Sequence, residues 1–155
     1  MTFKITGLAP EPFLPLFALS DAALAARGMA RHTARSKPGF PCRITLEDAE
    51  PGETLILLNH ESHSVKTPYR SAYAIYVRET ARQAAVYENA IPPVFLNRPI
   101  ALRLFDAEGM LRGAELVLKG DYADAINRAF QQADIAYIDA HNAAHGCFAA
   151  RVGRG

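Results

Sequence analysis

The sequence predicts an α+β fold, with a single domain over residues 1–155 and a largely antiparallel sheet of about six strands beside two or three helices. Short apolar segments with period-two alternation follow one another with few helical segments between them, which is typical of antiparallel sheets. Two of these segments flank the turn Asp106-Ala-Glu-Gly109 as a hairpin, and one clear amphipathic helix follows Asp121. The 155 residues are enough for one hydrophobic core and leave little room for a second domain.

The first part of the chain contains one expected strand and one short helix. Residues 2–6 alternate and predict an opening edge strand, and three prolines between residues 10 and 15 permit only short helical turns. Ser20 or Asp21 can then cap a short helix over residues 22–27. Residues 29–37 are basic and irregular, and we expect a mobile segment there.

The middle of the chain supplies two further strands. A stiff turn at residues 38–43 leads into a short strand-like alternation at residues 44–46. The continuous apolar run at residues 54–58 predicts a buried central strand. Residues 59–67 are expected to form a polar loop that holds two histidines, and residues 73–77 predict the next strand.

The last part of the chain holds the clearest helix and hairpin. Residues 100–105 and 110–119 predict the two strands of the hairpin. Strands are also expected at residues 134–138 and 148–152, on either side of a polar cluster. After Asp121, the apolar positions of the expected helix fall on one face: Tyr122, Ile126, Ala129, Phe130 and Ala133.

Composition and motifs exclude several classes of function. A net charge of +1 argues against a nucleic-acid partner, and no apolar stretch approaches the roughly 20 residues of a membrane helix. No signal-peptide pattern is visible, so we expect a cytoplasmic protein in which Cys42 and Cys147 are thiols. Glycine-rich nucleotide motifs and Gly-x-Ser-x-Gly are absent, and no cofactor is predicted. The oligomeric state stays open.

The polar segment 139–151 suggests a site with catalytic residues. Cys147 follows a glycine, which permits close approach of a substrate, and an imidazole of His141 or His145 can hold the sulfur as a thiolate nucleophile. A neighbouring carboxylate or amide can orient that imidazole. The simpler alternative is that Cys147 is a small buried side chain that packs beside Phe148.

A metal site is a weaker interpretation of the same residues. Zinc accepts mixed nitrogen, sulfur and oxygen ligands, but the spacing here matches none of the strong zinc signatures, and no metal is predicted. The motif His60-Glu-Ser-His63 has too short a step for a metalloprotease helix and is interpreted as a solvated loop. The zinc alternative would use His141, His145 and Cys147, with Cys42 or Asp139 as a fourth ligand.

An anion pocket is the third interpretation, because thirteen arginines stand against four lysines and guanidinium groups pair well with carboxylate or phosphate. Arg70, with Tyr69 as a stacking neighbour, and Arg151 are the best candidates. For Arg103, an ion pair with Glu115 on the returning strand is the simpler explanation. The arginines in or beside expected strands are Arg43, Arg70, Arg78, Arg103 and Arg151.

An ordered set of motifs resembles the DUF1203 family of bacterial proteins over about residues 1–154. The set comprises Pro38-Gly-Phe-Pro-Cys-Arg43, Pro51-Gly-Glu53 with the strand Leu55–Leu58, Thr67-Pro-Tyr-Arg70, Tyr76-Val-Arg-Glu79, and His141-Asn-Ala-x-x-Gly-Cys147 with Arg151. The family has no assigned activity, so the resemblance implies a soluble single-domain bacterial protein and says nothing about whether it is an enzyme. In one departure, Tyr73-Ala74 stands where the family pattern has Gly-Pro.

From these observations we expect the segments at Cys42–Arg43, Tyr69–Arg70 and His141–Arg151 to converge at one pocket. The preferred function is binding of a small anionic molecule by Arg70, Arg151 and the His141–Cys147 segment. The alternatives are a Cys/His-dependent enzyme that acts on a small acidic substrate, and a structural or interaction protein. The candidate ligand-binding residues are Arg43, Tyr69, Arg70, Asn142 and Arg151.

Overall fold

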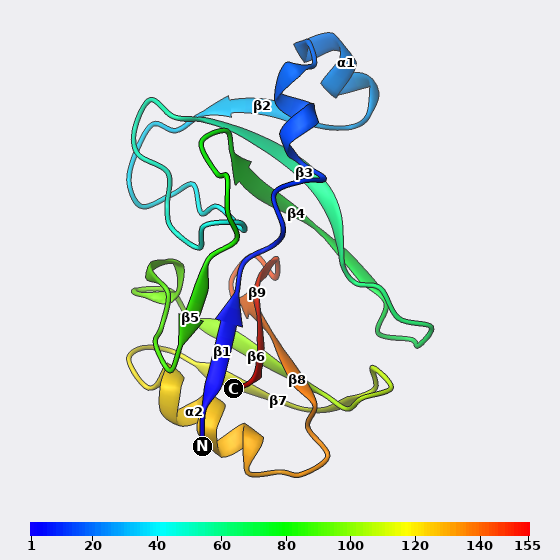
Figure 1. Ribbon diagram of the computed structural model, residues 1–155, viewed down its shortest axis with the longest axis vertical. Coiled ribbons are helices and arrows are strands. Elements are labelled where there is room, and N and C mark those ends of the chain that lie inside the picture. The colour runs from blue at the N-terminus through cyan, green and yellow to red at the C-terminus, as the bar shows by residue number, and fades with distance from the viewer.

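The computed structural model, which describes residues 1–155, contains two antiparallel sheets and two α-helices (Figure 1). The larger sheet has six strands in the order β5-β1-β9-β8-β6-β7, so the predicted α+β class and antiparallel sheet are confirmed. Its strands are β1 (Phe3–Thr6), β5 (Val86–Glu88), β6 (Ile100–Phe105), β7 (Leu111–Val117), β8 (Tyr137–Asn142) and β9 (Phe148–Arg154).

A second sheet of three strands, in the order β2-β3-β4, forms the other half of the molecule together with helix α1 (Figure 1). The sequence does not separate this sheet from the first. Its strands are β2 (Ala30–Thr33), β3 (Thr54–His63) and β4 (Ser71–Arg78), the helices are α1 (Asp21–Ala26) and α2 (Tyr122–Phe130), and two short 3-10 helices occur at Leu14–Ala18 and Pro93–Phe95.

Helix α2 packs its apolar face against the larger sheet. Ile126 and Phe130 are almost fully buried in the same cluster as side chains of β6, β8 and β9, as the predicted amphipathic pattern requires. Burial of each such side chain contributes about 1.5–3 kcal/mol. Asp121 lies at the N-cap position, but its side chain makes no capping hydrogen bond. Neither helix combines the length and the apolar character that a bilayer crossing needs.

The two faces of the larger sheet differ in chemistry because side chains alternate along each strand. On β6, Leu102 and Leu104 belong to the core beneath α2, whereas Arg103 points to the opposite face and donates a hydrogen bond to Tyr73 of β4. On β8, Ile138 likewise lies in the core, while the side chains on either side of it do not. The polar face is therefore the one that the β3–β4 pair covers.

Five expectations about the elements are wrong. Strand β2 occupies part of the segment that was expected to be mobile, because its backbone pairs with β3. Strand β3 continues through the expected loop to His63, and residues 44–46 form a turn. Strand β8 begins three residues later than expected and runs into the polar cluster. Strand β1 is not at an edge, because it lies between β5 and β9.

Candidate functional site

A tight turn between β8 and β9 presents Cys147 immediately before β9. The amide of Asn142 donates to the Cys147 carbonyl (2.9 Å), and the amide of Gly146 donates to the Asn142 carbonyl (2.8 Å). Gly146 has a φ of 79°, which favours glycine at this position. The Nδ1 of His141 donates to the Gly146 carbonyl (2.9 Å), so backbone and side chain together fix the turn.

Arg43 reaches this turn from a loop whose backbone is held on both sides. Its amide donates to the Tyr76 carbonyl of β4 (3.1 Å), and its carbonyl accepts from the amide of Leu8 (2.8 Å). Gly7 permits this close approach, because a Cβ there would lie 1.9 Å from the Ile44 carbonyl oxygen. The loop therefore carries Arg43 across from the smaller sheet toward the start of β9.

The guanidinium of Arg43 is buried, with 3% of the residue exposed, and it has no carboxylate partner. Nε donates to the Phe148 carbonyl (2.8 Å), Nη1 to the Pro41 carbonyl (2.7 Å) and Nη2 to the Sγ of Cys147 (3.2 Å). Burial lowers the pKa of Arg43 from its ordinary value, and the nearby thiols oppose that shift. A buried cation without a compensating carboxylate is costly, so a function for this group is expected.

Cys147 receives hydrogen bonds from two directions. Besides Arg43, the side-chain amide of Asn142 donates to its Sγ (3.3 Å). Both partners are donors, so the sulfur is the acceptor of both hydrogen bonds. The residue is partly exposed and is a free thiol.

Cys147 and Arg43 line a cavity of about 590 Å³ between the two sheets. This volume is typical of small-molecule sites. No aspartate or glutamate lines the wall, whereas two arginines and one histidine do. The complete lining is Gly39, Pro41, Arg43, Leu57, Tyr73, Ala74, Tyr76, Arg98, Asn142, His145 and Cys147.

The charge of Arg98, the second arginine of the wall, is partly neutralised by Asp48, which does not line the cavity. Its guanidinium binds both carboxylate oxygens of Asp48, at 2.6 Å and 3.0 Å. Burial alone would raise the pKa of Asp48, but the hydrogen bonds from Arg98 and the Gly39 amide outweigh it and lower that pKa. Asp48 therefore stays ionised, and of the two arginines Arg43 alone lacks a carboxylate partner.

His141 is a structural partner of the turn. It is buried, and burial lowers its pKa to about 4, while the Gly146 carbonyl opposes the shift. The ring is therefore neutral at pH 7, and it lies 4.9 Å from the Tyr73 ring, centroid to centroid. It makes no hydrogen bond to Cys147, so the expected thiol–imidazole pair with His141 is not formed. His145 is exposed and lies in the cavity wall, also without a hydrogen bond to the sulfur.

Arg151 is engaged elsewhere on the same sheet face. Its guanidinium binds Asp139 through Nε (2.7 Å) and Nη2 (3.0 Å), and it lies over the Tyr137 ring at 4.5 Å. Burial lowers the pKa of Arg151, but Asp139 outweighs burial and raises it above the ordinary value. A buried carboxylate thus compensates Arg151, which does not line the cavity.

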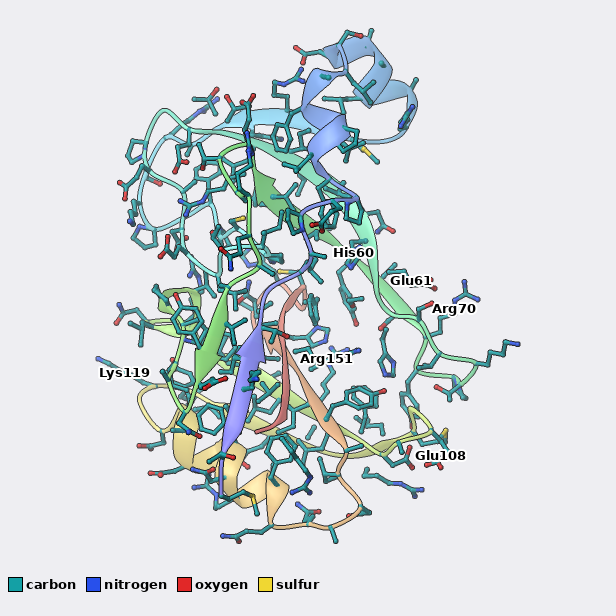
Figure 2. The ribbon with its side chains drawn as sticks, viewed as in Figure 1. His60, Glu61, Arg70, Glu108, Lys119 and Arg151 are labelled. Carbon is teal, nitrogen blue, oxygen red and sulfur yellow. The ribbon has the colours of Figure 1, made fainter.

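Tyr69 and Arg70 lie beyond the end of β3, away from the cavity wall. Figure 2 shows Arg70 beside Glu61, with which it forms an ion pair, and well apart from Arg151. Of the three segments that were expected to converge, only two therefore meet. The Cys42–Arg43 segment meets the His141–Cys147 turn, but the Tyr69–Arg70 turn does not join them. The extra length of β3 moves that turn away.

The other expected pairings are also different in the structure. No group of three or more His, Cys, Asp or Glu side chains could hold a metal, so the zinc alternative has no preformed site. His63 is buried rather than solvated: its Nδ1 donates to the Tyr69 carbonyl (2.8 Å) and its Nε2 lies 2.6 Å from the Tyr137 hydroxyl. Glu115 pairs with Arg128 of α2 and not with Arg103.

Sequence reasoning missed most of the cavity wall. Arg98 follows an irregular proline-containing stretch and no local pattern marks it. Tyr73 and Tyr76 were assigned only to a strand, and a strand pattern does not show which side faces a cavity. On β4, the one sequence signal at the wall is the departure at Tyr73-Ala74 from the family pattern.

The family model described as "Protein of unknown function (DUF1203)" matches residues 39–154. The chain belongs to the DUF1203 family. Both halves of the Arg43–Cys147 contact lie inside the matched range, while residues 1–38 lie outside it. No curated protein and no solved structure matches the chain. The description of DUF1203 assigns no activity, so the function has to be argued from the cavity.

Proposed function

We propose that the cavity above Cys147 binds a small anionic molecule with an apolar or aromatic body. The observation that carries this proposal is the buried Arg43 guanidinium, which has no carboxylate partner. A guanidinium has five N–H donors, and acceptors are present for three of those of Arg43. The remaining two can bind a carboxylate or phosphate oxygen.

The composition of the wall supports an anion rather than a cation. Arg98 and His145 add positive or polar character, and no carboxylate faces the cavity. Tyr73 and Tyr76 offer aromatic surface for the body of the ligand. Arg43, one of the predicted ligand-binding residues, and Arg98 are therefore proposed to bind the anion, because Arg70 and Arg151 do not line the cavity. We further propose that the protein works in the bacterial cytoplasm, where its two free cysteines stay reduced.

Titration calorimetry with benzoate and benzamide tests the proposal, because the two probes differ mainly in charge. A charge-assisted hydrogen bond is roughly twice as strong as a neutral one, so we expect benzoate to bind at least about tenfold tighter. Ala74→Trp should block binding, because Ala74 is exposed in the cavity wall and the indole would occupy space that the ligand needs, while neither core contains this residue. Arg70→Gln removes an arginine outside the cavity and should leave binding unchanged. Equal affinity for both probes, or no binding of either at millimolar concentration, refutes the proposal.

A further inference from the structure

We propose that Cys147 is a nucleophilic thiolate that forms a covalent bond with an electrophilic carbon of an anionic ligand in this cavity. The site thus has two parts, a reactive sulfur and an anion-binding wall. The preference for anionic electrophiles rests on the proposed function above. The nucleophilicity of the sulfur does not, because it follows from the contacts of Cys147 itself.

The contacts of the sulfur are those of an acceptor. The Nη2 of Arg43 and the Nδ2 of Asn142 lie 3.2 Å and 3.3 Å from Sγ, and both groups can only donate. A thiolate accepts such bonds far better than a thiol, since charge strengthens the hydrogen bond. Cys147 is also the one side chain that accepts a hydrogen bond from the Arg43 guanidinium, whose other two acceptors are backbone carbonyls.

The charged groups around the sulfur also favour a negative charge on it. The cations nearest the cavity are Arg43 and Arg98, and the carboxylate behind the wall, Asp48, is bound through both oxygens to Arg98. His141, behind the turn, is neutral at pH 7. The other titratable side chains of the wall are His145, Tyr73 and Tyr76, so no carboxylate repels a thiolate at Cys147.

The covalent step is balanced without an oxidant or reductant. A lone pair of Sγ forms the sulfur–carbon bond with the ligand. The electron pair displaced from that carbon leaves with a departing group, or moves onto a carbonyl oxygen that takes a proton from water. The Asn142 amide and the free N–H groups of Arg43 can stabilise that oxygen or the carboxylate of the ligand.

Cys42 provides an internal control within the same chain. It is fully buried, its sulfur accepts only from the backbone amide of Arg78 (3.4 Å), and it does not line the cavity. A buried thiol without a cationic donor is expected to react slowly. The two cysteines can be told apart by mass spectrometry of their peptides after a single reaction.

The test compares alkylation of Cys147 by iodoacetamide and by iodoacetate at about pH 6, where roughly one free thiol in 300 is ionised. The reference is N-acetylcysteinamide, a neutral model thiol. Hydrogen bonds from two donors stabilise the attacking sulfur anion, and its lower intrinsic reactivity offsets only part of the resulting gain in rate. We therefore expect iodoacetamide to modify Cys147 at least about tenfold faster than the reference thiol.

The anion-binding wall predicts a second result. The ratio of the iodoacetate rate to the iodoacetamide rate should be at least about tenfold higher for Cys147 than for the reference thiol. Asn142→Ala removes one donor to the sulfur and should slow both reactions several-fold, whereas Arg70→Gln should change neither. Cys42 should remain unmodified in the folded protein.

The possible failures can be distinguished. If iodoacetamide modifies Cys147 no faster than the reference thiol, the nucleophile is refuted, whether or not benzoate binds. If the reaction is fast but the rate ratio equals that of the reference, the nucleophile stands and selectivity for anions is refuted. A rate that is unchanged in Asn142→Ala would contradict the role of the two donors.

Discussion

Acidification should destabilise the protein through His141, and the size of the effect follows from its burial. The pKa of His141 is lowered to about 4 in the folded protein, against 6.5 for an unperturbed histidine. Between these two values the unfolded chain binds more protons than the folded one, so stability is full above about pH 6.5 and falls as the pH drops toward 4. The shift corresponds to about 3 kcal/mol in total, of which about 2 kcal/mol is lost between pH 7 and pH 5.

Urea unfolding of the wild-type protein and of His141→Asn, at both pH values, measures this contribution. The asparagine amide lies close to where Nδ1 lies, so it can still donate to the Gly146 carbonyl, but it does not titrate. Between pH 7 and pH 5, the free energy of unfolding of the wild-type protein should fall by about 2 kcal/mol more than that of the variant. His60, whose pKa is also lowered by burial, is present in both proteins and cancels in the comparison. An equal loss in both proteins would show that His141 is protonated in the folded state.

Two further substitutions test the polar layer between the sheets. Arg43→Met leaves the Phe148 and Pro41 carbonyls without their side-chain donor, although it also removes a buried charge, which offsets part of the loss. The free energy of unfolding, measured in urea, should fall by about 2–4 kcal/mol. Stability equal to wild type would refute the role of these bonds. Asp139→Asn weakens the bond to Arg151, and a loss of about 2 kcal/mol, measured by thermal unfolding, is expected because Arg151 is partly exposed. No change would mean that solvent compensates Arg151.

The elements that the sequence predicts well are those fixed by neighbours in the chain. The β6–β7 hairpin needs only a turn and two alternating strands, and α2 needs only a periodic apolar face. Elements that depend on distant partners were missed. Strand β5 is three residues long and exists because it pairs with β1, and β2 exists because β3 offers it an open edge. No local pattern carries that information.

The end of β3 shows how one distant contact changes a local interpretation. The polar stretch after residue 58 is typical of a loop, but His63 is buried because Tyr137, 74 residues later, meets its ring nitrogen. The strand therefore continues. Its added length carries Arg70 away from the cavity, so one missed contact also explains the wrong place of one predicted ligand-binding residue.

The candidate site was predicted only in part, because its contacts also join residues that lie far apart in the chain. The sequence marked Arg43 and Cys147 as candidates, but not that they touch, since 104 residues separate them. It ranked Arg70 and Arg151 higher because an arginine in a strand or beside a tyrosine is conspicuous in a sequence. In the structure those two have carboxylate partners and Arg43 has none. Charge compensation is a property of the folded state, and it decides which arginine is free to bind a ligand.

The position of the cavity between two sheets explains how one small domain can combine a stable fold with an open polar site. Each sheet has its own apolar cluster, one beneath α2 and the other between α1 and the β3–β4 pair. The cavity wall takes residues from both halves, yet of these only Arg43 is deeply buried. Substitutions at exposed positions such as Ala74 can therefore reshape the cavity without disturbing either cluster. On this reasoning, ligand specificity can vary at the wall while the Arg43–Cys147 contact, which joins the two halves, is retained.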